Sequence, residues 1–157
     1  VPSDKKVESG EFVLMDFGAT YDGWHSDMTR TVCVGKPSDK MKSVYETVLT
    51  AQLTALDAVK AGMSGKALDK IARDIIIEAG YGDNFGHSLG HGVGVEIHES
   101  PYASPSREDI LPENSIVTVE PGIYLEGKFG VRIEDFVVVT ENGCINMTKA
   151  PKELICL

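Results

Sequence analysis

Residues 11–34 read EFVLMDFGATYDGWHSDMTRTVCV, and this stretch predicts a β-hairpin. Apolar and β-branched side chains dominate 11–19 and 24–34, which we interpret as two strands. The residues between them include Asp22-Gly23, a pair typical of a tight hairpin turn. A two-residue loop centred between Tyr21 and Asp22 would place Asp16 directly opposite Asp27, with their Cβ atoms about 5 Å apart.

A second hairpin brings two more carboxylates together. Strands are expected at 116–120 and 131–140, joined through a loop whose middle residue is Gly127. Glu120 and Glu134 are equally distant from Gly127, so they should also lie opposite each other, or nearly so, unless a bulge at Pro121-Gly122 shifts the register.

Two opposed pairs of acids in apolar strands indicate a cation. Like charges opposite each other destabilise a sheet, and buried carboxylates are costly without a partner. A divalent metal is the simplest interpretation, because carboxylate oxygens are hard ligands and four of them can hold two ions. Two alternatives stay open at this point: each pair could share a proton, or the acids could face solvent.

The rest of the chain predicts an α+β fold. One helix is expected after Ser38, its N-cap candidate, and is stopped by Gly62. A second is expected over about 64–79, ended by Gly80. Asn142-Gly143 predicts a last hairpin. The order β-β-α-α-β-β-β favours two helices on one face of a mainly antiparallel sheet, in a single domain over residues 1–157.

Residues 84–100 hold three of the four histidines, His87, His91 and His98, among several glycines. Glycines around His91 would let the backbone approach a ligand closely. An imidazole added to the carboxylates makes a mixed nitrogen and oxygen site. Such a donor set favours Mn, Fe, Co or Zn over Ca or Mg.

Charge and cysteine content exclude several classes of protein. With 15 basic and 24 acidic residues the net charge is −9, which argues against nucleic acid or an anionic membrane as the main partner. No apolar run reaches the ~18 residues of a membrane span. The three cysteines include no CxxC pair, which argues against a zinc knuckle or a redox motif and favours a reducing, cytoplasmic compartment.

Four segments in this order resemble the signature blocks of a peptidase superfamily: LMDFGATYDGWHSDMTRT (14–31), HSLGHGVGVEIHESP (87–101), TVEPGIY (118–124) and GVRIEDFVVVT (130–140). The superfamily has the pita-bread fold and includes methionine aminopeptidase, aminopeptidase P and prolidase. The blocks are more similar to the proline-directed members. The resemblance implies a metallo-exopeptidase that cleaves between an N-terminal residue and a following proline, in dipeptides or longer peptides. The chain would be the C-terminal two-thirds, roughly, of the catalytic domain.

The same resemblance implies five metal ligands. Asp16 would hold one ion, His91 and Glu120 the second, and Asp27 and Glu134 would bridge both. Two divalent ions are implied, with manganese as the first expectation and Co, Zn or Fe as alternatives. A water between the ions would be the nucleophile.

Further roles are implied for residues around the metals. Glu120 would also move protons. His98 would contact the scissile amide and help stabilise the tetrahedral intermediate. His87 is similar to a substrate-binding histidine of the proline-directed members, and Arg132 would brace a carboxylate near the substrate. The implied partners are a small peptide substrate and a second copy of the chain, or the missing N-terminal half of the domain.

Other functions fit the same fold. A methionine aminopeptidase, a protein-binding module without hydrolytic activity, and a metal-free enzyme of the creatinase branch are alternatives. The five retained ligands argue against the last two. An inactive fragment, or a metal site with no catalytic role, is also left open.

Overall fold

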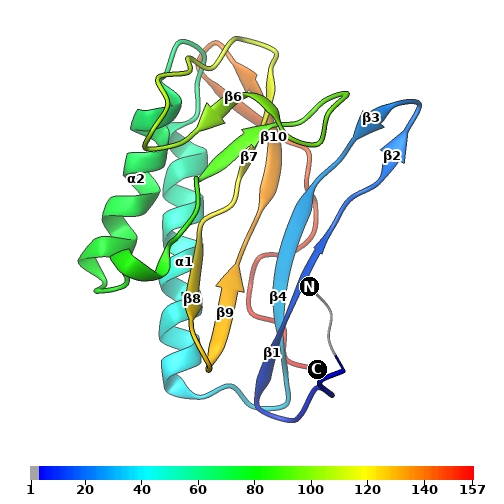
Figure 1. The fold of residues 1–157 in the computed structure, drawn as a ribbon, viewed down its shortest axis with the longest axis vertical. Helices are drawn as coiled ribbons and strands as arrows, with labels where there is room; N and C mark the ends of the chain where they lie inside the picture. The colour runs from blue at the N-terminus through cyan, green and yellow to red at the C-terminus, as the bar shows by residue number, and fades with distance from the viewer. Residues whose placement is uncertain (1–3) are drawn as a thin grey trace.

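A computed structural model describes residues 4–157, which form an α+β structure of two long helices and antiparallel strands (Figure 1). The strands are β1 (Glu11–Phe17), β2 (Thr20–Tyr21), β3 (Trp24–His25), β4 (Met28–Val34), β5 (Gly90–Gly92), β6 (Glu99–Ala103), β7 (Ile116–Val119), β8 (Gly122–Leu125), β9 (Phe129–Arg132), β10 (Asp135–Thr140) and β11 (Gly143–Asn146). The helices are α1 (Asp39–Ala58) and α2 (Gly65–Glu78), with a short 3-10 turn at Gly82–Asn84. Within residues 4–157, neither long helix is apolar enough to cross a membrane.

The first hairpin forms as predicted, but its register differs from the expected one. Asp16 pairs with Thr29 rather than with Asp27. Asp22 and Gly23 both have positive φ, 48° and 81°, so they are the two central residues of the turn. A turn of this hand needs φ above zero at both positions, which Asp and Gly tolerate and Tyr21 does not. Moving the turn by one residue moves the register by two, which keeps Asp27 on the face of Asp16.

The second hairpin has the expected register. Val119 pairs with Asp135 in the β7–β10 ladder, and Gly122 pairs with Arg132 in the β8–β9 ladder. Both ladders are centred on Gly127, so the Pro121-Gly122 step introduces no shift. Glu120 and Glu134 occupy the gap between the two ladders, where neither residue belongs to a strand.

The helices begin and end close to the expected points. Ser38 caps α1 by accepting a hydrogen bond from the Met41 backbone N–H at 3.2 Å. That helix ends at Ala58, earlier than predicted, and Gly62 lies in the turn beyond it with φ +76°. Gly80, with φ +83°, follows α2 as its C-terminal glycine.

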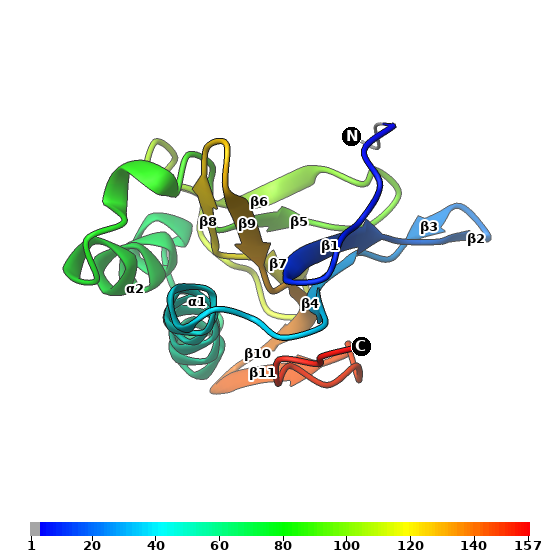
Figure 2. The ribbon, with the colours of Figure 1, turned by 90° about the horizontal axis from the view of Figure 1, so that it is seen from below.

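The helices pack against the strands around one core. A five-stranded sheet has the order β11-β10-β7-β5-β6, and α1 contacts β7, β8, β9 and β11 while α2 contacts β6. Figure 2 shows α1 lying between the β8–β9 hairpin and the β10–β11 pair. The core joins α1, α2 and the sheet through buried residues that include Val44, Val48, Leu68, Ile76, Val117, Val137 and Val139. The β1–β4 hairpin lies on the side away from α2 (Figure 1).

Candidate metal centre

Donor atoms from distant parts of the chain converge where β4, β5, β7 and β10 meet. One donor atom each from Asp27, His91 and Glu134 all lie within 4.8 Å of one another. Nε2 of His91 is 3.8 Å from Oδ2 of Asp27 and 3.1 Å from Oε1 of Glu120, so a third carboxylate borders the group. The fold therefore gathers four of the five expected ligands into one cluster.

The fifth expected ligand, Asp16, is held at the edge of this cluster. It lies on β1 with its side chain 51% exposed, and its carboxylate is paired with the Arg132 guanidinium. Its charge still reaches the cluster, because it contributes to the raised pKa of Asp27.

The tautomer of His91 follows from its backbone contact. Nδ1 lies 3.0 Å from the Gly92 carbonyl oxygen, which can only accept, so Nδ1 carries the hydrogen. Nε2 is then left facing Asp27 and Glu120. A lone pair aimed at carboxylates needs a proton or a cation between them. Burial lowers the pKa of His91, but the hydrogen bonds to Glu120 and Gly92 and the two negative charges outweigh it, and the net pKa is raised.

The carboxylates of the cluster show the same deficit of positive charge. Burial, with the charge of Glu120 added, raises the pKa of Glu134 to about 8, although its side chain is hydrogen-bonded to Thr29. Burial also raises the pKa of Asp27, and the charges of Asp16 and Glu120 add to it while His91 opposes it. Buried acids with raised pKa values beside an imidazole lone pair fit a divalent cation that would replace the missing charge.

Helix α2 and a close strand contact hold the histidine segment in place. Arg73 donates to the backbone oxygens of Phe85 at 2.9 Å and of His87 at 2.7 Å, and Asp69 accepts from the Leu89 backbone N–H at 2.9 Å. At Gly90 a Cβ atom would lie 2.0 Å from the Thr118 carbonyl oxygen. Glycine is thus needed here for the approach of β5 to β7 rather than to a ligand.

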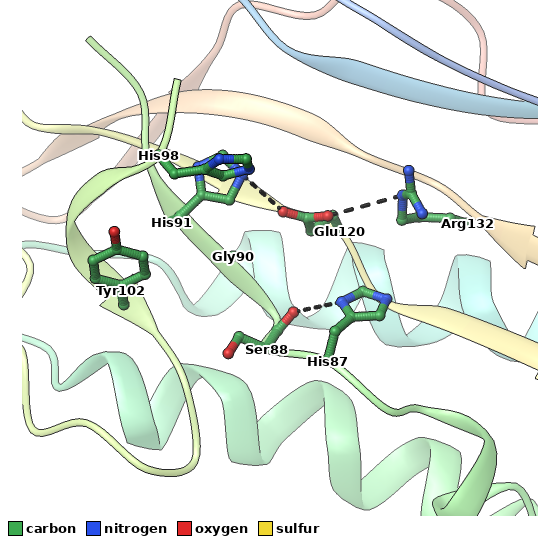
Figure 3. A pocket seen from close by; sticks show the side chains of 8 residues that line it. All are labelled: His87, Ser88, Gly90, His91, His98, Tyr102, Glu120 and Arg132. Carbon is green, nitrogen blue, oxygen red and sulfur yellow. Dashed lines mark hydrogen bonds and ion pairs between the residues drawn. The ribbon is translucent and has the colours of Figure 1, made fainter. Parts of the chain in front are cut away.

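Cavities open on both sides of the exposed His98. One of about 330 Å³ is lined by His87, Ser88, Gly90, His91, His98, Tyr102, Glu120 and Arg132 (Figure 3). The other, of about 410 Å³, is lined in part by Asp16, Asp27 and His98. The rings of His91 and His98 meet edge to face with centroids 4.3 Å apart. His98 therefore borders both spaces beside the donor cluster.

A sequence model of metallopeptidase family M24 matches residues 1–141. The chain belongs to this family. It is 54% identical to the Xaa-Pro dipeptidase of Pyrococcus furiosus over 155 residues, which is 99% of this chain and 44% of that protein. The structure superimposes on an Xaa-Pro dipeptidase from Bacillus anthracis with a TM-score of 0.97 at 53% identity, and on an X-Pro aminopeptidase from Thermotoga maritima with 0.95 at 54%. In each case 99% of this chain covers 44% of the solved one, so it spans under half their length. The predicted α+β, pita-bread fold is confirmed.

Two threonines that the sequence analysis did not single out support the carboxylates of this M24 site. Thr29 Oγ1 donates to Glu134 Oε2 at 2.6 Å and accepts from Arg132 Nε at 3.1 Å. Thr118 Oγ1 donates to Glu120 Oε1 at 2.9 Å and accepts from the His91 backbone N–H at 3.0 Å. Strand alternation was the available signal, because Thr118 lies two residues before Glu120 and so shares its face.

His87, expected to bind substrate in an M24 enzyme, has both ring nitrogens engaged. Nδ1 donates to the Ser88 carbonyl at 2.8 Å, and Nε2 accepts from the Tyr124 hydroxyl at 2.9 Å. Arg132 Nη1 in turn donates to Tyr124 at 2.8 Å. Burial lowers the pKa of His87, and the charges of Arg132 and Arg73 add to this, although Ser88 and Glu120 oppose it. Tyr124, not anticipated as a site residue, therefore links His87 to Arg132.

Proposed function

We propose that the longer protein to which this chain corresponds is a two-metal exopeptidase that hydrolyses the bond between an N-terminal residue and a following proline. The observation that carries this proposal is the buried cluster of Asp27, His91 and Glu134, bordered by Glu120, in a member of family M24. Similarity to proteins named Xaa-Pro dipeptidase and X-Pro aminopeptidase supports the class of bond. Because both kinds occur among the relatives, the proposal covers dipeptides and longer peptides.

The metal roles proposed for the five residues follow the donor set. Asp16 would hold one cation, His91 and Glu120 the other, and Asp27 and Glu134 both. Bound there, two divalent cations would supply Lewis-acid polarisation and a water of lowered pKa. We propose manganese as the native metal, with Co, Zn or Fe as alternatives, because one imidazole among carboxylates suits these ions. The Asp16 carboxylate is ion-paired with the Arg132 guanidinium. To bind a cation, Asp16 would have to leave this pair or use its second oxygen.

Residues beside the metals are proposed to act on the peptide. Glu120 is 14% exposed, at the wall of the 330 Å³ cavity, and would carry the proton from the attacking water to the leaving amine. His98, exposed between the two cavities, would donate to the oxygen on which negative charge develops. His87 and Arg132 line the same cavity and would position the substrate, His87 after exchanging its Tyr124 partner.

Location and assembly are also proposed. The free thiols Cys33, Cys144 and Cys156 support a reducing, cytoplasmic compartment.

Exposed apolar side chains on the β1–β4 hairpin, including Met15 and Phe17, support a partner surface. That partner would be a second copy of the chain or the remaining part of the longer protein. Light scattering on the full-length protein would measure which association occurs.

Metal content per chain is the first test. After dialysis against Mn, Co or Zn in turn, elemental analysis should find about two metal ions per chain. The Asp27→Ala variant should hold fewer. The full-length protein should then hydrolyse Xaa-Pro peptides, and Glu120→Gln should lose that activity by roughly a hundredfold or more while keeping its fold. A full-length protein that binds two metals yet cleaves no Xaa-Pro peptide under any of them would refute the proposed activity.

A further inference from the structure

Two cysteines far apart in sequence lie side by side in neighbouring extended segments. Cys33 in β4 forms an isolated parallel bridge with Cys156. The Cys33 backbone N–H donates to the Ile155 oxygen at 2.9 Å, and the Leu157 N–H donates to the Cys33 oxygen at 2.9 Å. Adjacent strands lie about 4.8 Å apart, which is inside the range of Cα separations that a disulfide spans.

The two thiols differ in access. Cys33 is fully buried, whereas Cys156 is exposed. Burial raises the pKa of the Cys33 thiol, and the adjacent Cys156 thiol raises it further. The third cysteine, Cys144, contacts the Leu56 carbonyl oxygen on α1 and has no such neighbour among the described cysteines.

The segment that carries Cys156 also contacts residues next to the candidate metal centre. Arg30 donates to the backbone oxygens of Ala150 and Pro151, both at 2.9 Å, and pairs with Asp135 at 2.7 Å. Lys152 pairs with the same Asp135 at 2.5 Å. Because Asp135 directly follows Glu134, residues 150–157, here called the C-terminal strap, help fix the start of β10.

We propose that Cys33 and Cys156 form a reversible disulfide site that fastens the C-terminal strap to β4 when the protein meets a low-molecular-weight disulfide. This inference does not depend on the proposed peptidase activity. The exposed thiol is the one that an outside reagent can reach. The buried thiol is then placed to complete the bond without itself meeting solvent.

The exchange with oxidised glutathione balances in two steps. The Cys156 thiolate, having lost its proton to solvent, attacks one glutathione sulfur, the glutathione S–S bond breaks, and one glutathione thiolate leaves. Cys33 Sγ then attacks Sγ of Cys156, the mixed disulfide breaks, and the second glutathione leaves as a thiol after its sulfur takes the Cys33 proton. The protein gives up two protons and two electrons, and one glutathione disulfide becomes two thiols.

The test is a titration of the chain with glutathione buffers of increasing oxidised fraction, followed by acid quenching, alkylation and mass spectrometry. The expected product has lost two hydrogens and alkylates at Cys144 alone. A non-reducing digest should contain one cross-linked peptide pair, Cys33 with Cys156. Reduction should restore three alkylated thiols.

Two variants make the assignment specific. Cys156→Ser, at an exposed position where folding is not at risk, should abolish the cross-link, and the matched control Cys144→Ser should retain it. The oxidised parent should also unfold at a temperature higher by roughly 10 °C, because the bond closes a long loop, and Cys156→Ser should show no such rise. Three alkylated thiols at every ratio, a glutathione adduct on Cys156 that never resolves, or a cross-link through Cys144 would each overturn the proposal.

Discussion

At the scale of single residues, the direction of two hydroxyl hydrogens decides how the glutamates are held. Thr29 and Thr118 each accept from an N–H group, of Arg132 and His91 respectively. An N–H can only donate, so each hydroxyl hydrogen must point at a carboxylate, Glu134 or Glu120. Each threonine therefore holds one oxygen of a glutamate carboxylate, Oε2 of Glu134 and Oε1 of Glu120. Oε1 of Glu120 is also the oxygen that lies 3.1 Å from Nε2 of His91.

Removing one of these hydroxyls should weaken metal binding without removing a ligand. Thr118→Val keeps the shape of the side chain and leaves Glu120 free to rotate, and we expect a 10- to 100-fold loss of metal affinity. Thr118→Ser keeps the hydroxyl and should bind within a few-fold of the parent. Titration calorimetry with Mn measures both, and equal affinities for the Val and Ser variants would contradict this role.

The stability of the metal-free chain should fall as the pH rises from about 4.5 to about 8. Glu134 has its folded-state pKa raised above the unfolded value of 4.5, so over this window the native state binds more protons than the unfolded state. The raised pKa values of Asp27 and His91 act in the same direction. Urea unfolding at several pH values measures the slope. Glu134→Gln should flatten it, and a slope of the opposite sign would show that Glu134 ionises readily in the folded chain.

At the scale of elements, the β1–β4 hairpin depends on a close backbone approach beside its turn. A Cβ atom at Gly18 would lie 1.9 Å from the Ser26 carbonyl oxygen and 3.5 Å from Cα of Asp27. Neither neighbour is the end of a flexible side chain, so any residue larger than glycine must displace the segment between β3 and β4 that carries Asp27.

Gly18→Ala should therefore destabilise the fold and disturb the metal site together. We expect a loss of about 1–3 kcal/mol in the free energy of unfolding, together with weaker metal binding. Gly86→Ala is the matched control, because a Cβ atom there meets nothing within 4 Å, and its effect should stay below about 1 kcal/mol. Urea unfolding compares the two. Equal stabilities would mean that the hairpin can open at Gly18 without cost.

At the scale of the whole molecule, Asp135 joins three parts of the fold. It is fully buried and accepts from Gln52 on α1, Arg30 on β4 and Lys152 on the C-terminal strap. Burial alone would raise the pKa of Asp135, but the hydrogen bonds from Lys152, Arg30 and Asn146 outweigh it and hold the pKa below its usual value. Helix, hairpin and strap therefore meet on a single ionised carboxylate.

Loss of that charge should destabilise the molecule as a whole. Asp135→Asn leaves two buried or partly buried cations without their counter-charge, and we expect a loss of roughly 3–5 kcal/mol. Asp74→Asn, in the exposed pair with Lys70, is the control and should cost under about 1 kcal/mol. Chemical denaturation measures both, and a small effect at Asp135 would mean that Arg30 and Lys152 reach solvent when it is neutralised.

The amino-acid sequence by itself determined the features that depend on local chemistry or on a run of residues. Capping and glycine signals predicted both helices, and the odd-length loop at Gly127 predicted the register of Glu120 with Glu134, because turn geometry acts over a few residues. The four motif blocks identified the family. Where two turn placements were only one residue apart, the prediction failed, and Asp16 proved to face Thr29.

Only the tertiary structure decided which groups each side chain meets. The Arg132 guanidinium pairs with Asp16, the Tyr124 hydroxyl bonds to His87, and Cys33 lies beside Cys156. The two residues of each pair are separated by tens of residues or more in the sequence. No local pattern encodes such contacts, because they depend on how the sheets and helices pack together. The sequence thus predicted candidate ligands and the chemistry they suit, while packing determines which of these side chains lie together and which are held by other partners.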